Sequence, residues 1–337
     1  MANNFFGIDI GTSNIRIYNQ LDNSIFMEKN MIAIENGNVL LAYGDSAFDM
    51  YEKAPGNIVA SFPVINGVIA DISNMETLLK LFITDLSKGS LKPADFVIAV
   101  PTDVTDVEKR AFYDLVEDSG VKAHKIHVVE KAIADGLGLG IDVKNSQGVM
   151  IVNVGYSTTE ISILSLGGIV LSRIVKVAGK QFDDDIINTV RKEFNLHIGE
   201  KTAERIKISM KSLIESGENI VCYGRDVVSG LPMEREIPPE ILDANLRDSY
   251  AQIIDCVKMV LERTPPELGS DIYRHGLYLT GGSSQIYNLA PLIAEATGLK
   301  VNTSEDPIDS VIMGIAKVIN EEKFRPLAYY IEGMSGR

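Results

Sequence analysis

Glycine and hydroxyl residues cluster in two short turns, each placed where an apolar strand is predicted to end. The first turn is Gly11-Thr12-Ser13-Asn14, shortly after Asp9, and the second runs from Gly155 to Thr158, shortly after Asn153. Such turns direct several backbone N–H groups into one concavity, which binds an anion without a lysine. A carboxylate beside bound phosphates can hold a hydrated Mg²⁺ through its waters. The turns therefore predict phosphate binding, with Asp9 on the metal side.

The two turns belong to a repeat of strand, turn and strand. After the first turn, apolar residues alternate at Ile15 and Ile17, and after the second at Ile161 and Ile163. This is the period of a β-strand. Either hairpin alone is more often an unrelated turn, because Gly-Ser-Thr turns are common. Found twice, and each time opening a strand-rich segment followed by helices, the hairpin indicates two related α/β domains.

A third turn, Thr280-Gly281-Gly282-Ser283, leads from an apolar strand into a helix, and its glycines would let the backbone approach a base or ribose closely. Elsewhere Asn36-Gly37 predicts a hairpin over residues 32–41. Strands alternate with helices, which favours an α/β fold with helices packed on sheets. Strands are predicted at 96–100, 128–129 and 277–279, and helices at 75–88, 103–119, 132–140, 182–194, 200–214 and 246–263. Lys201 with Arg205 and Lys207 with Lys211 have the spacing of a solvated basic helix face.

Composition excludes several classes of protein. The chain has 337 residues and a formal charge of −14, from 32 basic and 46 acidic residues, without a basic block, so nucleic acid is not an expected partner. Two cysteines cannot staple a domain of this size and fit a reducing cytosol. The N-terminus lacks a basic n-region, and no apolar run reaches the roughly 18 residues that span a bilayer. We therefore expect a cytoplasmic protein.

The chain resembles the actin-like ATPase superfamily, and within it the MreB-type bacterial actins, over essentially its full length. The match begins at the first turn and continues to the third. It is carried by residues 7–14, Gly67-Val68-Ile69-Ala70-Asp71, Val100-Pro101, Thr158-Thr159-Glu160, residues 198–207, Gly230-Leu231-Pro232, Thr264-Pro265-Pro266, Leu279-Thr280-Gly281-Gly282 and Ser304-Glu305-Asp306-Pro307.

The resemblance implies an actin-like fold. This fold has two related domains, each a mixed β-sheet flanked by helices, with smaller inserted subdomains and a nucleotide cleft between the domains. It further implies ATP or ADP with Mg²⁺, and head-to-tail assembly into paired cytoskeletal filaments at the inner face of the membrane, which govern cell shape or movement. The implied boundaries are 1–31, 67–142 and 313–337 for subdomain IA, 32–66 for IB, 143–180 and 252–312 for IIA, and 181–251 for IIB.

Residue roles also follow from the resemblance, position by position. Glu130 matches the family's glutamate that orients the attacking water, and Asp9 and Thr158 complete the implied catalytic set. A carboxylate suits this role because hydrolysis needs a group that directs a water proton in line with the γ-phosphate. Without the resemblance, a solvated acid after a strand explains Glu130 equally well. The implied nucleotide contacts are Gly11, Thr12, Ser13, Asn14, Asn153, Gly155, Tyr156, Ser157, Thr158, Gly179, Gly281, Gly282 and Ser283, with Glu204 and Lys207 at the ribose and base.

The sequence departs from the family at the second turn. Asn153 stands where the family has aspartate, and Tyr156 and Ser157 replace two glycines. Asparagine keeps the shape but removes a negative charge that would help to organise the water around Mg²⁺. The two added side chains restrict the backbone where it must approach phosphate closely.

Two lysines and a serine also replace family residues. Lys131 follows Glu130 in place of proline, Lys180 replaces an aspartate, and Ser283 replaces a third glycine. The lysines would either offset lost metal binding or form salt bridges at the surface. Anion binding by backbone amides survives such changes better than water activation does. We therefore expect nucleotide binding with slow ATP hydrolysis.

Other functions are weighed against this one. A small-molecule kinase of the same superfamily would need a substrate base beyond the ATP site, and no second acidic constellation is visible. An Hsp70-type chaperone would need a peptide-binding domain after the ATPase region, whereas the chain ends at Arg337. Weak peripheral membrane contact would depend on the loop Lys88–Pro93, which offers the single apolar residue Leu91. One leucine contributes at most about 2 kcal/mol, so we expect adhesion only from a filament that repeats the contact.

Overall fold

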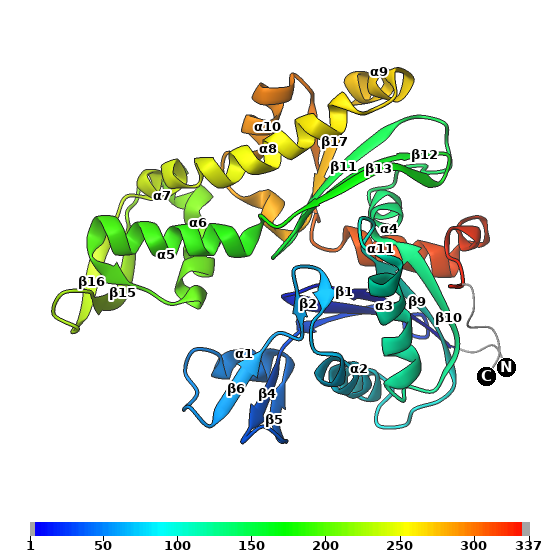
Figure 1. The fold of residues 1–337 in the computed structure, drawn as a ribbon, viewed down its shortest axis with the longest axis horizontal. Coiled ribbons are helices and arrows are strands. Elements are labelled where there is room, and N and C mark those ends of the chain that lie inside the picture. The colour runs from blue at the N-terminus through cyan, green and yellow to red at the C-terminus, as the bar shows by residue number, and fades with distance from the viewer. Residues whose placement is uncertain (1–3, 332–337) are drawn as a thin grey trace. The chain divides into compact units, whose positions relative to one another are not determined.

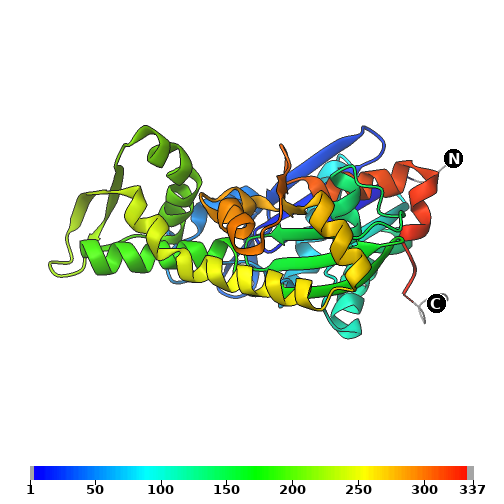
Figure 2. The ribbon, with the colours of Figure 1, turned by 90° about the horizontal axis from the view of Figure 1, so that it is seen from above.

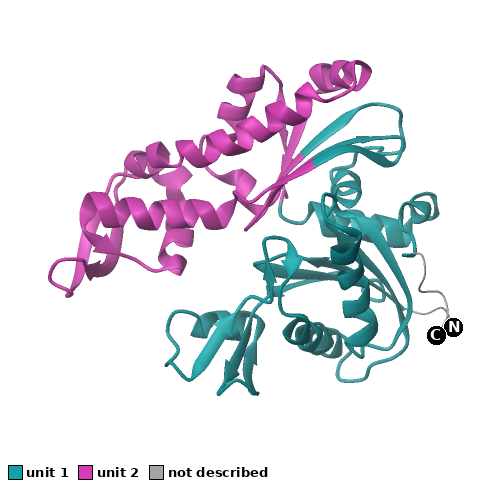
Figure 3. Ribbon diagram, viewed as in Figure 1, with its two compact units in different colours: residues 1–151, 162–172, 308–337 teal, residues 152–161, 173–307 magenta. Residues whose placement is uncertain are grey.

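The computed structural model describes residues 4–331 (Figure 1, and from above in Figure 2). The chain divides into two compact units (Figure 3). Unit 1 comprises residues 1–151, 162–172 and 308–337, and unit 2 comprises residues 152–161 and 173–307. The finer division into four subdomains stays a prediction.

A five-stranded sheet of order β10-β9-β1-β2-β3 lies at the centre of unit 1. β1 pairs in parallel with β9 and antiparallel with β2, and β9 pairs in parallel with β10. Ile8, Ile98 and Val128 are in register across the parallel strands. The carboxyl ends of these strands therefore meet at one edge of the sheet, where α/β proteins bind ligands. The strands are β1 (Asn4–Ile10), β2 (Asn14–Asn19), β3 (Ser24–Lys29), β9 (Ala94–Val100) and β10 (Ala123–Glu130).

Helices cover both faces of this sheet, and the alternation of side chains along β1 assigns residues to them. Phe6 and Ile8 belong to the core cluster that contains the apolar residues of α2 and α3. Gly7 faces the other layer, since a Cβ there would lie 2.5 Å from Ile315 Cγ2 of α11. Asp9 shares the face of Gly7 and is turned toward α4 and α11. These helices are α2 (Ile72–Leu86), α3 (Asp106–Asp118), α4 (Lys131–Gly138) and α11 (Ser310–Asn320).

Helices α4 and α11 pack against each other through glycines. A Cβ on Gly314 would overlap the main-chain oxygen of Ala134, and one on Gly138 would overlap that of Ser310. The two backbones can approach this closely only because neither glycine carries a side chain. The contact fixes α4, which begins directly after Glu130.

Replacing Gly314 with alanine is expected to lower the free energy of unfolding by about 2 kcal/mol, because the new methyl meets a main-chain carbonyl that cannot rotate away. Urea denaturation followed by circular dichroism would measure the change. Gly56→Ala is the control, since nothing lies within 4 Å of its added Cβ, and it should change stability by less than about 0.5 kcal/mol. Equal stability of the two variants would contradict the packing argument.

Smaller elements of unit 1 lie between residues 32 and 69 and near residue 325. Asn36 and Gly37 adopt positive φ values of 50° and 76°, which confirms the predicted hairpin between β4 and β5. β4 lies between β5 and β6 in a three-stranded sheet, and β7 pairs with β8. The bounds are β4 (Ile32–Glu35), β5 (Val39–Tyr43), α1 (Gly44–Met50), β6 (Ile58–Ser61), β7 (Val64–Ile65), β8 (Val68–Ile69) and η2 (Glu322–Leu327).

A second five-stranded sheet has the order β13-β12-β11-β17-β18. β17 pairs in parallel with β18. Both large sheets thus place a strand–turn–strand hairpin, β1–β2 and β11–β12, beside further strands. The strands are β11 (Val149–Val154), β12 (Thr159–Ser165), β13 (Gly168–Val175), β17 (Leu277–Thr280) and β18 (Val301–Thr303).

The helices of unit 2 pack through buried apolar faces. The rings of Phe182 on α5 and Tyr250 on α8 meet edge to face, with centroids 5.5 Å apart. β14, β15 and β16 form a small antiparallel sheet. The bounds are α5 (Gly179–Phe194), β14 (Leu196–His197), α6 (Glu200–Ser216), β15 (Ile220–Asp226), β16 (Pro232–Ile237), α7 (Pro239–Asn245), α8 (Arg247–Glu262), α9 (Pro266–His275), η1 (Gly282–Gln285) and α10 (Leu289–Thr297).

Two observations bear on membrane contact. Within residues 4–331, no helix combines the length and apolar composition that crossing a bilayer requires. Leu91, on the loop expected to touch the membrane, is partly buried and packs against the core of unit 1. Contact through Leu91 stays a prediction, and it would require this side chain to leave its packing.

Candidate functional site

The first predicted phosphate turn is rigidly held in unit 1. Gly11 N donates to Asn14 O over 3.0 Å and closes the turn between β1 and β2. Asn30 holds this turn through two hydrogen bonds. Its side-chain amide donates to Gly11 O at 2.9 Å, and its backbone N–H donates to Ser13 O at 2.9 Å. Asn30 is fully buried. Asn30 could not be predicted from the sequence, because a lone asparagine after a strand belongs to no recognisable motif.

The second predicted turn, in unit 2, closes with the same bond. Gly155 N donates to Thr158 O over 3.0 Å, as Gly11 N does to Asn14 O. The turn is also tied to the start of α5, since Gly155 O accepts from Gly179 N at 3.2 Å and Tyr156 O accepts from the backbone N–H of Lys180 at 2.6 Å. The predicted repeat of two similar hairpins is therefore confirmed.

The third turn lies against the second hairpin. Gly281 has a φ of +86°, and a Cβ there would lie 2.7 Å from Asn153 Oδ1 and would overlap Val154 O. Only glycine fits this left-handed, crowded position. Gly282 and Ser283 follow in the short helix η1. The structure thus brings the predicted residues Asn153 and Gly281 together.

Gly179, Ser283 and Lys207 converge at the start of α5. A Cβ on Gly179 would overlap Ser283 Oγ and lie 3.2 Å from Lys207 Nζ. Lys207 Nζ donates to Gly179 O at 3.0 Å. Glu204 lies one turn before Lys207 on α6 and is partly exposed. Unit 2 therefore brings together Gly179, Ser283 and Lys207, three of the residues expected to contact the nucleotide.

The prediction that Lys207 belongs to a solvated basic helix face is wrong. Lys207 is buried and forms an ion pair with Asp183, whose carboxylate oxygens lie 2.8 and 2.9 Å from Nζ. Burial raises the pKa of Asp183 to about 6, and Lys207 opposes that rise. Asp183 was not predicted from the sequence, since only the fold places it opposite Lys207.

Glu130 lies at the carboxyl end of β10 in unit 1. Its Oε1 accepts from Lys109 Nζ at 2.8 Å and from the Tyr329 hydroxyl at 2.9 Å. Its Oε2 is buried and accepts no hydrogen bond from the described residues. The pKa of Tyr329 is raised, mainly by burial and secondly by the nearby charge of Glu130. The phenol therefore stays protonated and donates its hydrogen bond to Glu130. One oxygen is therefore fixed, and the other is available to accept from a water.

Asp9 and Lys131 meet at the same sheet edge. Lys131, the first residue of α4, donates from Nζ to Asp9 Oδ1 at 3.1 Å, and the Asp9 side chain is only 5% exposed. The sequence left open whether the two unusual lysines offset metal binding or form salt bridges. Both form ion pairs, since Lys180 Nζ lies 3.5 Å from Asp184 and 3.3 Å from Glu200.

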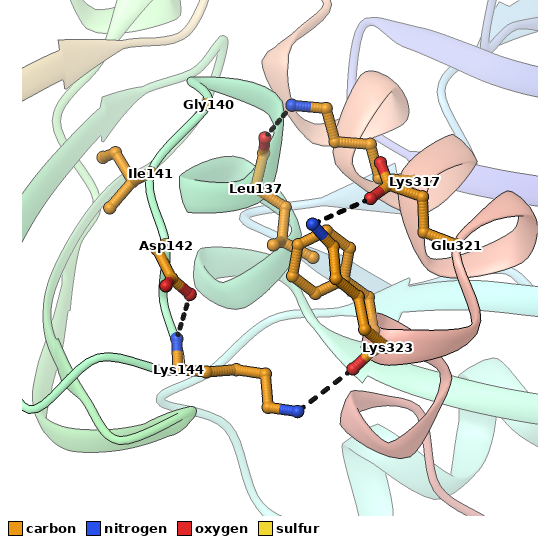
Figure 4. Close-up of a pocket in the computed structure, with 9 residues that line it drawn as sticks. Leu137, Gly140, Ile141, Asp142, Lys144, Lys317, Glu321 and Lys323 are labelled. Atoms are coloured by element: carbon orange, nitrogen blue, oxygen red, sulfur yellow. Dashed lines mark hydrogen bonds and ion pairs between the residues drawn. The ribbon is translucent and has the colours of Figure 1, made fainter.

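A cavity of about 450 Å³ lies beside the other end of α4 (Figure 4). Lys317 Nζ donates to Leu137 O at 2.7 Å, and Lys144 Nζ donates to Lys323 O at 3.1 Å. The lysines thus join the carboxyl end of α4 and the loop after it to α11 and η2. None of the predicted site residues lines this cavity. We infer that the lysines at the cavity stabilise the position of α4. Its lining is Leu137, Gly140, Ile141, Asp142, Lys144, Lys317, Glu321, Lys323 and Phe324.

The repeated hairpins and sheet-edge turns define the actin-like class of nucleotide-binding folds. The family model of the MreB/Mbl protein matches residues 3–325. The chain therefore belongs to the MreB/Mbl family, and it has the actin-like α/β fold expected from its sequence.

Named relatives agree with this assignment. The chain is 38% identical over 318 residues to the cell shape-determining protein Mbl of Bacillus subtilis, covering 93% of this chain and 95% of that protein. It is 36% identical over 329 residues to the cell shape-determining protein MreB of Escherichia coli, covering 95% and 94%. Similar solved structures include MreB5 of Spiroplasma citri bound to AMPPNP, with a TM-score of 0.90, 35% identity, and coverage of 97% and 98%. The ADP-bound form of MreB5 has a TM-score of 0.89.

Proposed function

We propose that this protein binds ATP and ADP and polymerises head-to-tail into cytoskeletal filaments that govern cell shape or movement. The observation that carries the proposal is the matching pair of turns, closed by Gly11 N to Asn14 O and by Gly155 N to Thr158 O. Each turn gathers backbone N–H groups where phosphates bind in such sites. The similar MreB5 structures hold AMPPNP and ADP, and named relatives are cell shape-determining proteins. These relatives favour the cytoskeletal function over a small-molecule kinase.

We further propose slow ATP hydrolysis. Glu130 would orient the attacking water through Oε2, while Lys109 and Tyr329 hold Oε1. Thr158 would contribute from the second turn. Tyr156 and Ser157, where glycines are expected, restrict that turn, and Asn153 adds no charge to it. Binding should therefore be retained better than turnover, because catalysis requires closer placement than binding does.

The expected Mg²⁺ fits the described residues poorly. Asp9, its expected partner, already accepts a hydrogen bond from Lys131. The expected role needs the Asp9 oxygens to face the waters of a hydrated Mg²⁺, and one of them already faces the Lys131 ammonium. We therefore assign no step to the metal.

Self-association completes the proposal. A head-to-tail polymer needs two unlike, complementary faces on each subunit. We propose paired protofilaments in the cytoplasm, with weak contact to the inner face of the membrane only where many subunits repeat it.

Two measurements test nucleotide binding and assembly. ATP at about one hundred times its Kd should stabilise the protein by about 2.7 kcal/mol and raise its melting temperature. Light scattering should then rise on addition of ATP at protein concentrations that permit assembly. Guanosine triphosphate and a sugar substrate serve as comparisons. A melting temperature unchanged by ATP in every buffer would refute nucleotide binding, and soluble turnover of a sugar without scattering would favour the kinase.

A further inference from the structure

The ion pair between Asp9 and Lys131 occupies the place where the sequence led us to expect a metal-side carboxylate. Asp9 ends the face of β1 that is turned toward α4, two residues before the Gly11 turn. Lys131 opens α4, directly after β10. The two residues are 122 positions apart, and the parallel strands β1, β9 and β10 bring them to one sheet edge.

The geometry makes this pair more than a surface contact. The Asp9 side chain is 5% exposed and that of Lys131 is 23% exposed, with 3.1 Å between Oδ1 and Nζ. Charges shielded from water interact more strongly than exposed ones, and they are screened less by salt. The packing of α4 against α11 fixes the backbone from which the Lys131 side chain extends. From this position the ammonium reaches Asp9 Oδ1.

A cation at this position changes what Asp9 can do for a metal. A divalent ion drawn to Asp9 would meet the positive charge of Lys131, and like charges at short range repel. The equivalent position in the second hairpin has no carboxylate, since the Asn153 side chain is a neutral amide. Asp9 already has a cationic partner beside the first turn.

We propose that Lys131 takes over the electrostatic role of a divalent cation at Asp9, so that the protein binds ATP with little dependence on Mg²⁺. This inference rests on the proposed nucleotide binding. The ammonium neutralises Asp9, which would otherwise repel the phosphates, and it adds a cation at the edge where the Gly11 turn offers its N–H groups. Lys131 acts here as a residue that determines metal dependence, and it needs no part in the hydrolysis itself.

The test is the ratio of two dissociation constants for ATP, measured by isothermal titration calorimetry with EDTA and with excess Mg²⁺. For the unmodified protein we expect this ratio to stay below about threefold, because Lys131 is present in both buffers. For Lys131→Gln we expect a ratio above about tenfold, because Asp9 is then unpaired and needs the metal to offset its repulsion of the phosphates. Lys131→Arg keeps the charge and should retain the low ratio.

Lys144→Gln is the matched control, since it removes one lysine charge from the same unit at the cavity beside the end of α4. Its ratio should equal that of the unmodified protein. Circular dichroism confirms folding of each variant, and Lys131→Arg provides the comparison if Lys131→Gln does not fold. Failure to bind ATP in either buffer would overturn the proposed function. Binding that requires Mg²⁺ in the unmodified protein, or an equal ratio in Lys131→Gln, would overturn the role of Lys131 alone.

Discussion

Replacing Glu130 with glutamine should slow phosphate release from ATP by about 10²-fold, the usual contribution of a positioned general base. Glutamine keeps the size and an acceptor for Lys109 and Tyr329, which both donate to Oε1 of Glu130. It removes the negative charge of Oε2, the buried oxygen without a partner among residues 4–331. A water held there would lose its proton acceptor. Single-turnover phosphate release measures the effect.

Binding should separate from turnover in the same variant. The dissociation constant for ATP is expected to change by less than about twofold, because the phosphate turns are left intact and Glu130 is expected to contact only the water. Tyr329→Phe is the graded comparison: it keeps the ring and removes one hydrogen bond to Oε1, so release should fall by only about tenfold. Unchanged phosphate release in Glu130→Gln would show that this carboxylate does not activate the water.

Local patterns were enough to predict most of the fold. The Asn36-Gly37 hairpin and the helices expected at 75–88 and 103–119 appear as β4–β5, α2 and α3, with ends displaced by up to three residues. β10 is longer than the predicted strand at 128–129, since it begins at Ala123. The polar residues at 124, 125 and 127 hide its first half, because β10 is an edge strand and leaves part of its surface to solvent.

Within the candidate site, only the turns could be predicted from the sequence. Glycine and hydroxyl patterns located residues 11–14, 155–158 and 281–283, because those turns are specified by neighbouring residues. The partners of Glu130 and Lys207 were not predictable. Tyr329 lies 199 residues from Glu130, and Asp183 lies 24 residues from Lys207. Such partners meet only because the fold packs distant elements together, so no regular spacing in the sequence indicates them.

The ion pair of Asp183 and Lys207 supports the largest expected loss of stability. Asp183→Ala should lower the free energy of unfolding by about 3–5 kcal/mol, because the ammonium of Lys207 is then buried without its carboxylate. The pair is nearly fully shielded, with side-chain exposures of 3% and 9%. Urea denaturation of unit 2, followed through a probe in α5 or α6, would measure the loss.

The same pair separates stability from nucleotide binding. In the double variant Asp183→Leu with Lys207→Met, no buried charge is left, so stability should return to within about 1–2 kcal/mol of the unmodified protein. Nucleotide affinity should fall in this variant, because Lys207 is an expected contact of the ribose and base and its bond to Gly179 O joins α6 to the start of α5. Recovery of both properties would mean that Lys207 has no role in nucleotide binding.

The pH dependence of unfolding tests the state of Asp183. Its pKa is about 6 in the folded protein against an ordinary value of 3.8, so the folded state holds this proton more tightly than the unfolded state does. The resulting contribution to stability is complete below about pH 4 and is lost as the pH rises through about 6. The double variant lacks this carboxyl, so its stability relative to the unmodified protein should increase by about 2 kcal/mol between pH 4 and pH 7. A constant difference across that range would mean that the folded and unfolded states hold the Asp183 proton equally tightly, which would contradict the raised pKa.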